Sequence, residues 1–258
     1  MQELVKLDRV SMAYGRGAAA VRAIDEVTLD IARGEFIAVV GPSGCGKSSL
    51  MRLISGLHPP LGGALTVEGK PVTGPLKSVG MAFQNSNLLP WRNAIDNVLL
   101  PLEIVEPYRS NFDKGKFSGK AKDLLHSVGL AGFTEKHPWE LSGGMQQRTS
   151  ICRALIHEPE ILLLDEPFGA LDAFTREELW CALRDLQAAR KVTVMLVTHD
   201  LREAVFLADT VYVMSSRPGR IVRRCAVPIP RPRDLEVTYT QAFQDIVHEL
   251  RSLIGQKH

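Results

Sequence analysis

The stretch Gly41–Ser49 reads GPSGCGKSS and decides the fold, because it follows the apolar run FIAVV at 36–40 and leads into the helical run KSSLMRLISGL. Its spacing is a glycine, four residues, and then Gly-Lys-Ser, which is typical of a loop that wraps a phosphate chain between a strand and a helix. The glycines let consecutive backbone N–H groups point at phosphate oxygens at the helix start. The sequence therefore predicts a nucleotide-phosphate site at this loop.

Each residue type of the loop has a physical task in such a site. Lys47 neutralises the β- and γ-phosphate charge, and the Ser48 hydroxyl suits Mg²⁺. Cys45 occupies a position that the pattern leaves free, so we expect a small filler there whose alkylation blocks nucleotide binding. The expected contacts of the loop with the nucleotide are Gly41, Pro42, Ser43, Gly44, Cys45, Gly46, Lys47, Ser48 and Ser49.

Continuous apolar strands indicate a sheet that is covered on both faces. ILLL at 161–164 and VMLV at 194–197 have no polar alternation, which in an α/β pattern favours parallel strands. Ligands of such sheets lie at the carboxyl ends of the strands. Four apolar runs end in different polar groups: the glycine loop, Gln84, Asp165 with Glu166, and His199.

These strand ends supply the remaining groups of a triphosphate site. Asp165 is expected to hold Mg²⁺ through its hydration shell, and Glu166 to orient or deprotonate the attacking water. Gln84 is expected near the metal and this water, and His199 on the γ-phosphate. The predicted catalytic residues are Glu166, His199, Gln84 and Lys47, and the predicted metal ligands are Ser48, Gln84 and Asp165.

Composition limits the classes of partner. The chain has 258 residues, 45% of them apolar, and a formal charge of +2, so it can bury a core and has no large electrostatic footprint for nucleic acid. MQELVKLDRV at the N-terminus has no apolar signal core, and no run approaches the roughly 18 apolar residues that span a bilayer. We expect no nucleic-acid partner, and any membrane role to depend on another subunit.

A second anion-seeking helix start occurs about a hundred positions after the first. LSGGMQQRTSICRALI begins at Leu141, where Ser142 can cap a helix and Gly143 and Gly144 leave the backbone N–H groups uncovered. An amphipathic run follows. One chain thus carries two phosphate-binding helix starts, and the first already forms a complete cradle.

Taken in order, these motifs resemble the ATPase subunit of ATP-binding cassette transporters. The likeness rests on the phosphate loop, Gln84, LSGGMQ, ILLLDE, ALD at 170–172 and His199, and covers nearly the whole chain. It implies an α/β fold: a phosphate-loop NTPase core with a mainly parallel sheet, an N-terminal antiparallel β subdomain and an inserted α-helical subdomain. We expect one nucleotide-binding domain over 1–258, with its core at 1–84 and 158–230, the helical insert at 85–157 and a C-terminal helical tail at 231–258.

The resemblance also implies that two copies work together. In that family two ATPase domains meet head to tail, and each ATP lies between the phosphate loop of one and the Ser-Gly-Gly helix of the other. We therefore expect a homodimer with two ATP molecules and Mg²⁺. The positions that match the contacts in trans are Ser142, Gly143, Gly144 and Gln146. Asp172 matches the aspartate that links the two sites, and Tyr14 the aromatic that stacks on adenine, although a tyrosine at a strand end often only packs.

The implied partners are transmembrane permease subunits and, in an importer, a periplasmic binding protein, which places the chain at the cytoplasmic face of the plasma membrane. The family docks its permease beside the glutamine loop, where Leu88, Leu89 and Trp91 cluster here; packing within the helical insert is the alternative. LLPWRN also resembles the branch that imports nitrate, sulfonates or taurine. The arginine-rich segment at 217–233 could meet lipid or an acidic partner, but a solvated edge strand with a proline turn is the favoured interpretation.

Other functions fit the residues less well. A cassette ATPase for DNA repair would separate Gln84 from Ser142 by a very long coiled coil, whereas only 85–141 lies between them, and ribosome-associated types carry two cassettes. A nucleotide-gated regulator that hardly hydrolyses ATP is disfavoured by the intact Glu166 and His199. A small-molecule kinase or GTPase would not carry Ser-Gly-Gly, and no Asn-Lys-x-Asp guanine reader occurs.

Overall fold

The computed structural model describes residues 2–15 and 20–255, and the chain forms two compact units. The first unit comprises residues 1–76 and 193–258, and the second comprises residues 77–192. The helical insert expected at 85–157 falls within the second unit, which also contains two strands and a long helix. The last three residues of the expected C-terminal tail lie outside the described part. Within that part, no helix is both long and apolar enough to cross a membrane.

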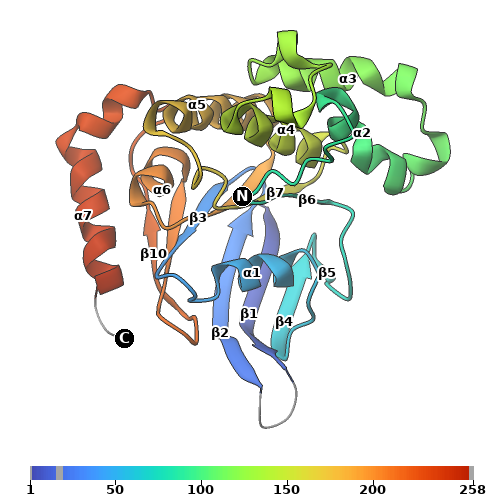
Figure 1. The fold of residues 1–258 in the computed structure, drawn as a ribbon. Helices are drawn as coiled ribbons and strands as arrows, with labels where there is room; N and C mark the ends of the chain where they lie inside the picture. Colours follow the sequence, from blue (N-terminus) through green and yellow to red (C-terminus); the bar gives the residue numbers. More distant parts are fainter. Residues whose placement is uncertain (1, 16–19, 256–258) are drawn as a thin grey trace. The chain divides into compact units, whose positions relative to one another are not determined.

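The N-terminal strands of the first unit form an antiparallel sheet of order β2-β1-β4-β5 (Figure 1). Its strands are β1 (Glu3–Tyr14), β2 (Val21–Ala32), β4 (Gly62–Val67) and β5 (Lys70–Pro71). In β1, Val5 and Leu7 are buried while Lys6 between them is exposed, the alternation of a sheet with one solvated face. The expected N-terminal antiparallel subdomain is confirmed.

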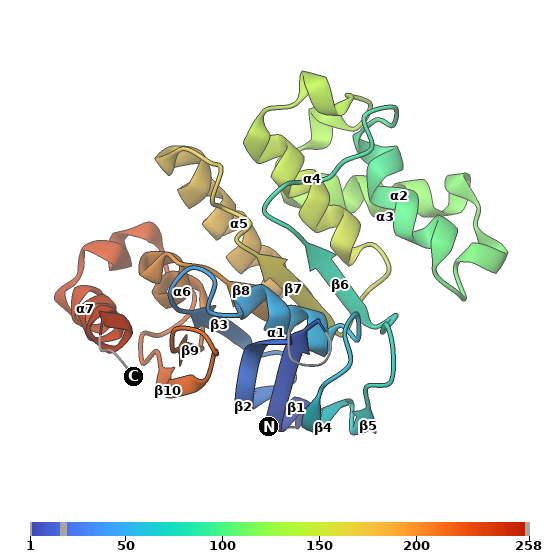
Figure 2. The same ribbon diagram turned by 60° about the horizontal axis from the view of Figure 1, so that its bottom comes forward.

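The second group of strands in the first unit has three fully buried members and one partly exposed edge strand, β10. β3 (Phe36–Val40) pairs in parallel with β8 (Thr193–Val197) and β9 (Thr210–Met214), and β10 (Ile221–Ala226) runs antiparallel to β9. Every residue of β3, β8 and β9 is buried, as the uninterrupted apolar runs predict. The helices of this unit are α1 (Lys47–Ile54), α6 (Leu201–Leu207) and α7 (Gln241–Gly255), with the 3₁₀ turn η5 (Leu235–Tyr239). α7 packs beside α6 (Figure 2).

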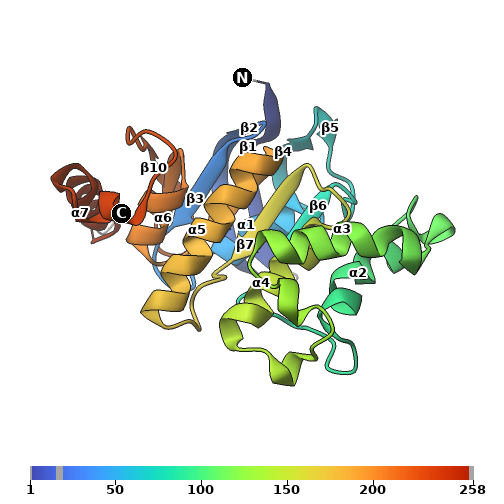
Figure 3. The ribbon, with the colours of Figure 1, turned by 90° about the horizontal axis from the view of Figure 1, so that it is seen from above.

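The second unit combines a pair of parallel strands with helices. β6 (Val79–Ala82) pairs with β7 (Ile161–Asp165), and α2, α3 and α4 pack against one another (Figure 3). Gly80 of β6 lies so close to α4 that a side chain there would overlap the Ala154 carbonyl oxygen. The helical segments are α2 (Ala94–Ile104), η2 (Arg109–Asn111), α3 (Lys114–Ser127), η3 (Ala131–Phe133), η4 (Pro138–Glu140), α4 (Gly143–Leu155) and α5 (Ala173–Arg190).

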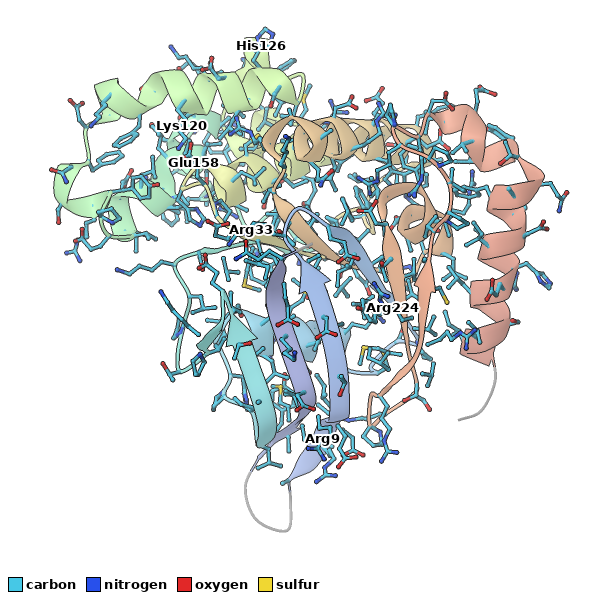
Figure 4. The ribbon with its side chains drawn as sticks, turned by 180° about the vertical axis from the view of Figure 1, so that it is seen from behind. Arg9, Arg33, Lys120, His126, Glu158 and Arg224 are labelled. Carbon is cyan, nitrogen blue, oxygen red and sulfur yellow. The ribbon has the colours of Figure 1, made fainter. Side chains whose placement is uncertain are left out.

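The polar stretch at 106–120, which its composition predicts to be an exposed loop, is partly helical. α3 already begins at Lys114, because the Asp113 side chain caps it by accepting a hydrogen bond from the Gly115 N–H at 2.8 Å. Phe117 then packs against the ring of Tyr108. The loop prediction is therefore wrong for 114–120. Lys120 on the same helix pairs with Glu158 at 2.9 Å (Figure 4).

The arginine-rich segment is an edge strand with proline turns, as favoured, but it is not solvated throughout. Arg224 stands on the edge strand β10, whereas Arg233 is only 3% exposed. The Arg233 Nη1 group donates to the carbonyl oxygens of Val205, Phe206 and Ala208 at the end of α6, at 2.7–3.0 Å. Burial lowers the pKa of Arg233 to about 10. A guanidinium supplies the donors that the last helical carbonyls need, so this arginine has a structural partner inside the chain.

Candidate functional site

The predicted phosphate loop joins β3 to α1 in the first unit. Gly44 and Gly46 have φ angles of 75° and 107°, a region that residues with side chains rarely adopt. A side chain on Gly46 would also lie 2.7 Å from the Ala23 carbonyl oxygen. The loop therefore needs glycine at 46 for both conformation and space.

Lys47 is held at the loop itself. Its ammonium group donates to the carbonyl oxygens of Gly41 at 2.9 Å and Pro42 at 3.1 Å, and the residue is 5% exposed. Cys45 is 1% exposed, and burial raises the pKa of its thiol. The filler role expected of Cys45 agrees with this burial. The loop presents one cation to a bound anion, which suits a phosphate chain.

His199 lies at the same sheet edge as this loop. Val39 of β3 is in register with Val197 of β8, so both strands end together. Two contacts fix the turn around the histidine: the Thr198 N–H donates to the Val39 carbonyl oxygen at 3.2 Å, and the Asp200 carboxylate caps α6. The pairing of strands thus explains why residues far apart in sequence meet.

A cavity of about 560 Å³ opens at this edge of the first unit. It brings the predicted residues Gly41, Pro42, Ser43 and His199 together. Sequence reasoning missed its other wall, where Val247, Arg251 and Ile254 of α7 line the space. No motif signals these residues, since their role depends on where the C-terminal helix docks.

Tyr14 ends β1 beside the helix that follows the loop. Its hydroxyl lies 3.1 Å from the Ser49 Oγ, and the Arg52 guanidinium donates to it at 3.1 Å. Its ring packs in a T-shaped arrangement against His58, with 5.5 Å between the ring centroids. The Tyr14 hydroxyl is therefore hydrogen-bonded to residues of α1, and the stacking of its ring on adenine stays a prediction.

The other predicted groups lie in the second unit. A cavity of about 260 Å³ is lined by Gln84, Gly143 and Gln146 together with Ala170 and Leu171 of the loop before α5. Ser142 caps α4, because its hydroxyl accepts a hydrogen bond from the Met145 N–H at 3.3 Å. The helix start expected from LSGG is present, with Gly143 as its first residue.

The side-chain amide of Gln146 makes its hydrogen bonds within the second unit. The side-chain nitrogen donates to the carbonyl oxygens of Pro138 at 2.9 Å and Leu141 at 3.2 Å, and the side-chain oxygen accepts from the Ser86 hydroxyl at 3.2 Å. This side chain ties the loop after Gln84 to the start of α4. Ser86 has no motif that would mark it from sequence. A direct contact of Gln146 with nucleotide stays a prediction.

The acidic groups lie at the end of β7 and in the loop that follows. Asp165 ends the strand, and Glu166 adopts a φ of 46°, a left-handed conformation that is uncommon outside glycine. Strained residues of this kind cluster at functional sites. Asp172 caps α5, and the hydrogen bonds from Thr175 hold the pKa of its carboxyl below the usual value.

The expected metal ligands suit Mg²⁺ chemically. A hydroxyl from Ser48, an amide oxygen from Gln84 and a carboxylate from Asp165 are the hard oxygen donors that this ion prefers. Among the described residues there is no cluster of three or more His, Cys, Asp or Glu. A set with one carboxylate agrees with an ion that keeps much of its water shell.

Comparison with known proteins decides the family. The model of the family described as "ABC transporter" matches residues 24–169. The chain belongs to the ABC transporter family. An ABC cassette of this kind is an ATP-binding ATPase, and the transport-ATPase expectation from the motifs is confirmed.

Curated relatives of this ABC cassette are import ATP-binding proteins. The "Aliphatic sulfonates import ATP-binding protein SsuB" of Bacillus licheniformis is 42% identical over 221 residues, 86% of this chain and 84% of the relative. The "Taurine import ATP-binding protein TauB" of Yersinia pestis bv. Antiqua is 44% identical over 205 residues, 80% of this chain and 78% of the relative.

A solved structure confirms the fold of the cassette. An ATP-binding cassette in a dimeric, post-hydrolysis state bound to ADP and Pi superimposes with a TM-score of 0.76 at 32% identity, covering 88% of this chain and all of the other. The predicted phosphate-loop NTPase architecture is thereby borne out.

Proposed function

We propose that this ABC cassette hydrolyses ATP between two copies of itself and couples their closure to import through a membrane partner. The proposal is supported by two helix starts of the kind that binds phosphate, which occur in separate units, one at the loop 41–49 and one at Ser142. A single nucleotide needs one cradle. A second start is accounted for if it serves the nucleotide of another copy.

The chemistry of hydrolysis follows from the residue types. The backbone N–H groups of the loop and the Lys47 ammonium hold the β- and γ-phosphates. Glu166 orients and deprotonates the attacking water, with Gln84 beside it. His199 donates to the γ-phosphate as its negative charge grows in the transition state. The nucleotide contacts proposed in this copy are the residues of the loop and the ring of Tyr14, which stacks on adenine.

Magnesium would be held by Ser48, Gln84 and Asp165, where it would neutralise charge on the phosphate oxygens. The three side chains offer oxygen atoms of the kind that the ion prefers. Their joint binding of the ion is part of the proposal.

Closure of the dimer completes each site. Ser142, Gly143 and Gly144 would contact the γ-phosphate bound to the opposite copy, while Gln146 keeps that helix start in place and Asp172 links the two sites. Such a pair is two-fold symmetric, so each copy uses the same surface. ATP that binds the closed pair more tightly shifts the equilibrium toward it, and hydrolysis removes this bias.

The transport partner is argued from the relatives and from one exposed surface. Trp91 is 71% exposed in the loop after Gln84, and an exposed tryptophan suits an anchor for a permease helix. Because relatives are named for import of aliphatic sulfonates and taurine, we assign small organic anions of the sulfonate class as cargo, delivered by a periplasmic binding protein. The cassette would work at the cytoplasmic face of the plasma membrane.

One variant tests the catalytic part. Glu166→Gln keeps the shape of the side chain and removes the base, so it should bind ATP, lose hydrolysis and accumulate as an ATP-bound dimer in gel filtration. Glu158→Gln removes a carboxylate from an exposed ion pair and serves as the control with normal turnover. Normal hydrolysis by Glu166→Gln would refute the assignment.

A further inference from the structure

An exposed indole stands three residues before the Ser142 helix cap. Trp139 is 68% exposed, although it belongs to the short turn η4 (Pro138–Glu140). Its ring stacks on His137 with 4.5 Å between centroids and 5° between planes. One face of the indole is therefore covered by the imidazole, and the opposite face is open to solvent. A tryptophan in this state presents a flat aromatic surface of large area.

The turn that carries this platform is held by hydrogen bonds. The Glu140 carboxylate accepts from the His137 backbone N–H and from the Lys136 ammonium, both at 2.8 Å, which closes the turn around the indole. Because the stack and these bonds fix the ring beforehand, a ligand that binds there loses little further side-chain freedom.

The same turn is attached to the start of α4. The Gln146 side chain donates to the carbonyl oxygens of Pro138 and Leu141, on either side of Trp139 and Glu140. Three residues of chain span at most about 11 Å, so the indole lies within reach of whatever sits on Ser142. In an extended ATP molecule, the distance from the γ-phosphate to the adenine is similar to this span of chain. A nucleotide whose γ-phosphate lies at Ser142 can therefore place its base near the indole.

We propose that Trp139 stacks on the adenine of the ATP bound to the opposite copy, on the face of the base that Tyr14 of that copy leaves open, so that the base is read in trans. The inference rests on the proposed function, because it requires the Ser142 helix to meet the partner's nucleotide. A stacked aromatic platform binds a base through its π-face and adds binding without contacting the phosphates. Trp139 then binds the base in the closed pair and takes no part in the hydrolytic step.

The test uses the Glu166→Gln protein, in which closed pairs persist. Tryptophan fluorescence of this protein is recorded on adding ATP and Mg²⁺ at several protein concentrations. The same titration is then made with the double variant Glu166→Gln, Trp139→Phe. The difference between the two titrations reports residue 139, since Trp91 and Trp180 are common to both. Quenching at Trp139 should appear together with the dimer in gel filtration and move to lower ATP as protein concentration rises.

Affinity gives the second measurement. Trp139→Ala should raise the ATP concentration that half-saturates dimer formation by about tenfold, within the range of base–aromatic stacking, and Trp139→Phe should recover most of this loss. Tyr239→Ala is the control, because Tyr239 is a comparably exposed aromatic at 73% in η5 of the first unit.

The outcomes separate the two levels of the proposal. A dimer that forms with ATP but shows no quenching at Trp139 and no loss in Trp139→Ala overturns the stacking and leaves the proposed function standing. Quenching that is independent of protein concentration overturns the assignment in trans. The absence of any ATP-dependent dimer overturns the proposed function itself.

Discussion

Asn97 provides the sharpest stability prediction, because one buried amide holds the loop that carries Trp91. The residue is 0% exposed on α2. Its Oδ1 accepts from the Leu89 N–H at 2.7 Å, and its Nδ2 donates to the carbonyl oxygens of Leu89, Arg92 and Asn93 at 3.0–3.1 Å. Two N–H hydrogens serve three carbonyls, so the side chain makes about three full hydrogen bonds.

Asn97→Leu keeps the number and branching of the side-chain heavy atoms and removes these bonds. At about 1 kcal/mol for each hydrogen bond, the free energy of unfolding should fall by about 3 kcal/mol, and more if the buried Leu89 N–H finds no other partner. Urea unfolding followed by circular dichroism measures the change. Asn111→Leu, at an exposed position of the same unit, should change stability by less than about 0.5 kcal/mol. A loss below about 1 kcal/mol for Asn97→Leu would show that water replaces the amide and that the reasoning fails.

Three further predictions concern the site and its surroundings. Gly144→Ala would place a methyl group against the Thr175 Cγ2 atom, so the free energy of unfolding measured in urea should fall by about 1–3 kcal/mol. Thr175→Ser removes this Cγ2 atom, so the double variant should regain the lost stability. A double variant that is no more stable than Gly144→Ala would show that the overlap is not the cause. Burial lowers the pKa of His157, so as pH drops below about 6.5 the unfolded chain takes up a proton before the folded chain does, and the free energy of unfolding should fall. His157→Gln should reduce this loss of stability at low pH. His126→Gln, on the exposed side of α3 (Figure 4), serves as the control and should leave the loss unchanged. N-ethylmaleimide should react slowly with the buried Cys45 thiol and abolish ATP binding once it has reacted. The Cys45→Ala protein should bind ATP and keep this binding in the presence of the reagent. Equal loss of ATP binding in the unsubstituted protein and in Cys45→Ala would assign the effect to another cysteine.

The strands and the helix starts could be predicted from sequence because local chemistry determines them. The uninterrupted apolar runs at 36–40 and 194–197 lie in buried parallel strands, and Ser142 caps the helix that LSGG predicts. In the same way, the strand that ends at Asp165 places a carboxylate at its carboxyl end. The spacing of apolar residues, together with capping residues and glycines at the ends, is enough to predict such elements.

What sequence could not predict depends on tertiary contact. Arg251 lines the cavity at the phosphate loop only because α7 returns there, and no motif marks it. Arg233 looks like one of several surface arginines until its burial against the end of α6 is known. The helix at 114–120 was hidden by its polar composition, since a single capping bond at Asp113 was enough to start it. Gln146 matched a motif position, but its amide faces Ser86 and the turn before α4.

The central claim is that one ATP is held by the loop of one copy and the Ser142 helix of another. It is tested most directly by mixing two proteins that both carry Glu166→Gln and Cys45→Ser, one with Ser43→Cys and the other with Ser142→Cys, and adding a short thiol-reactive crosslinker. With ATP and Mg²⁺, the account predicts a covalent dimer in the mixture and none in either protein alone. A chain that carries both cysteines and crosslinks only within itself, or a mixture that forms no covalent dimer with ATP, would contradict it.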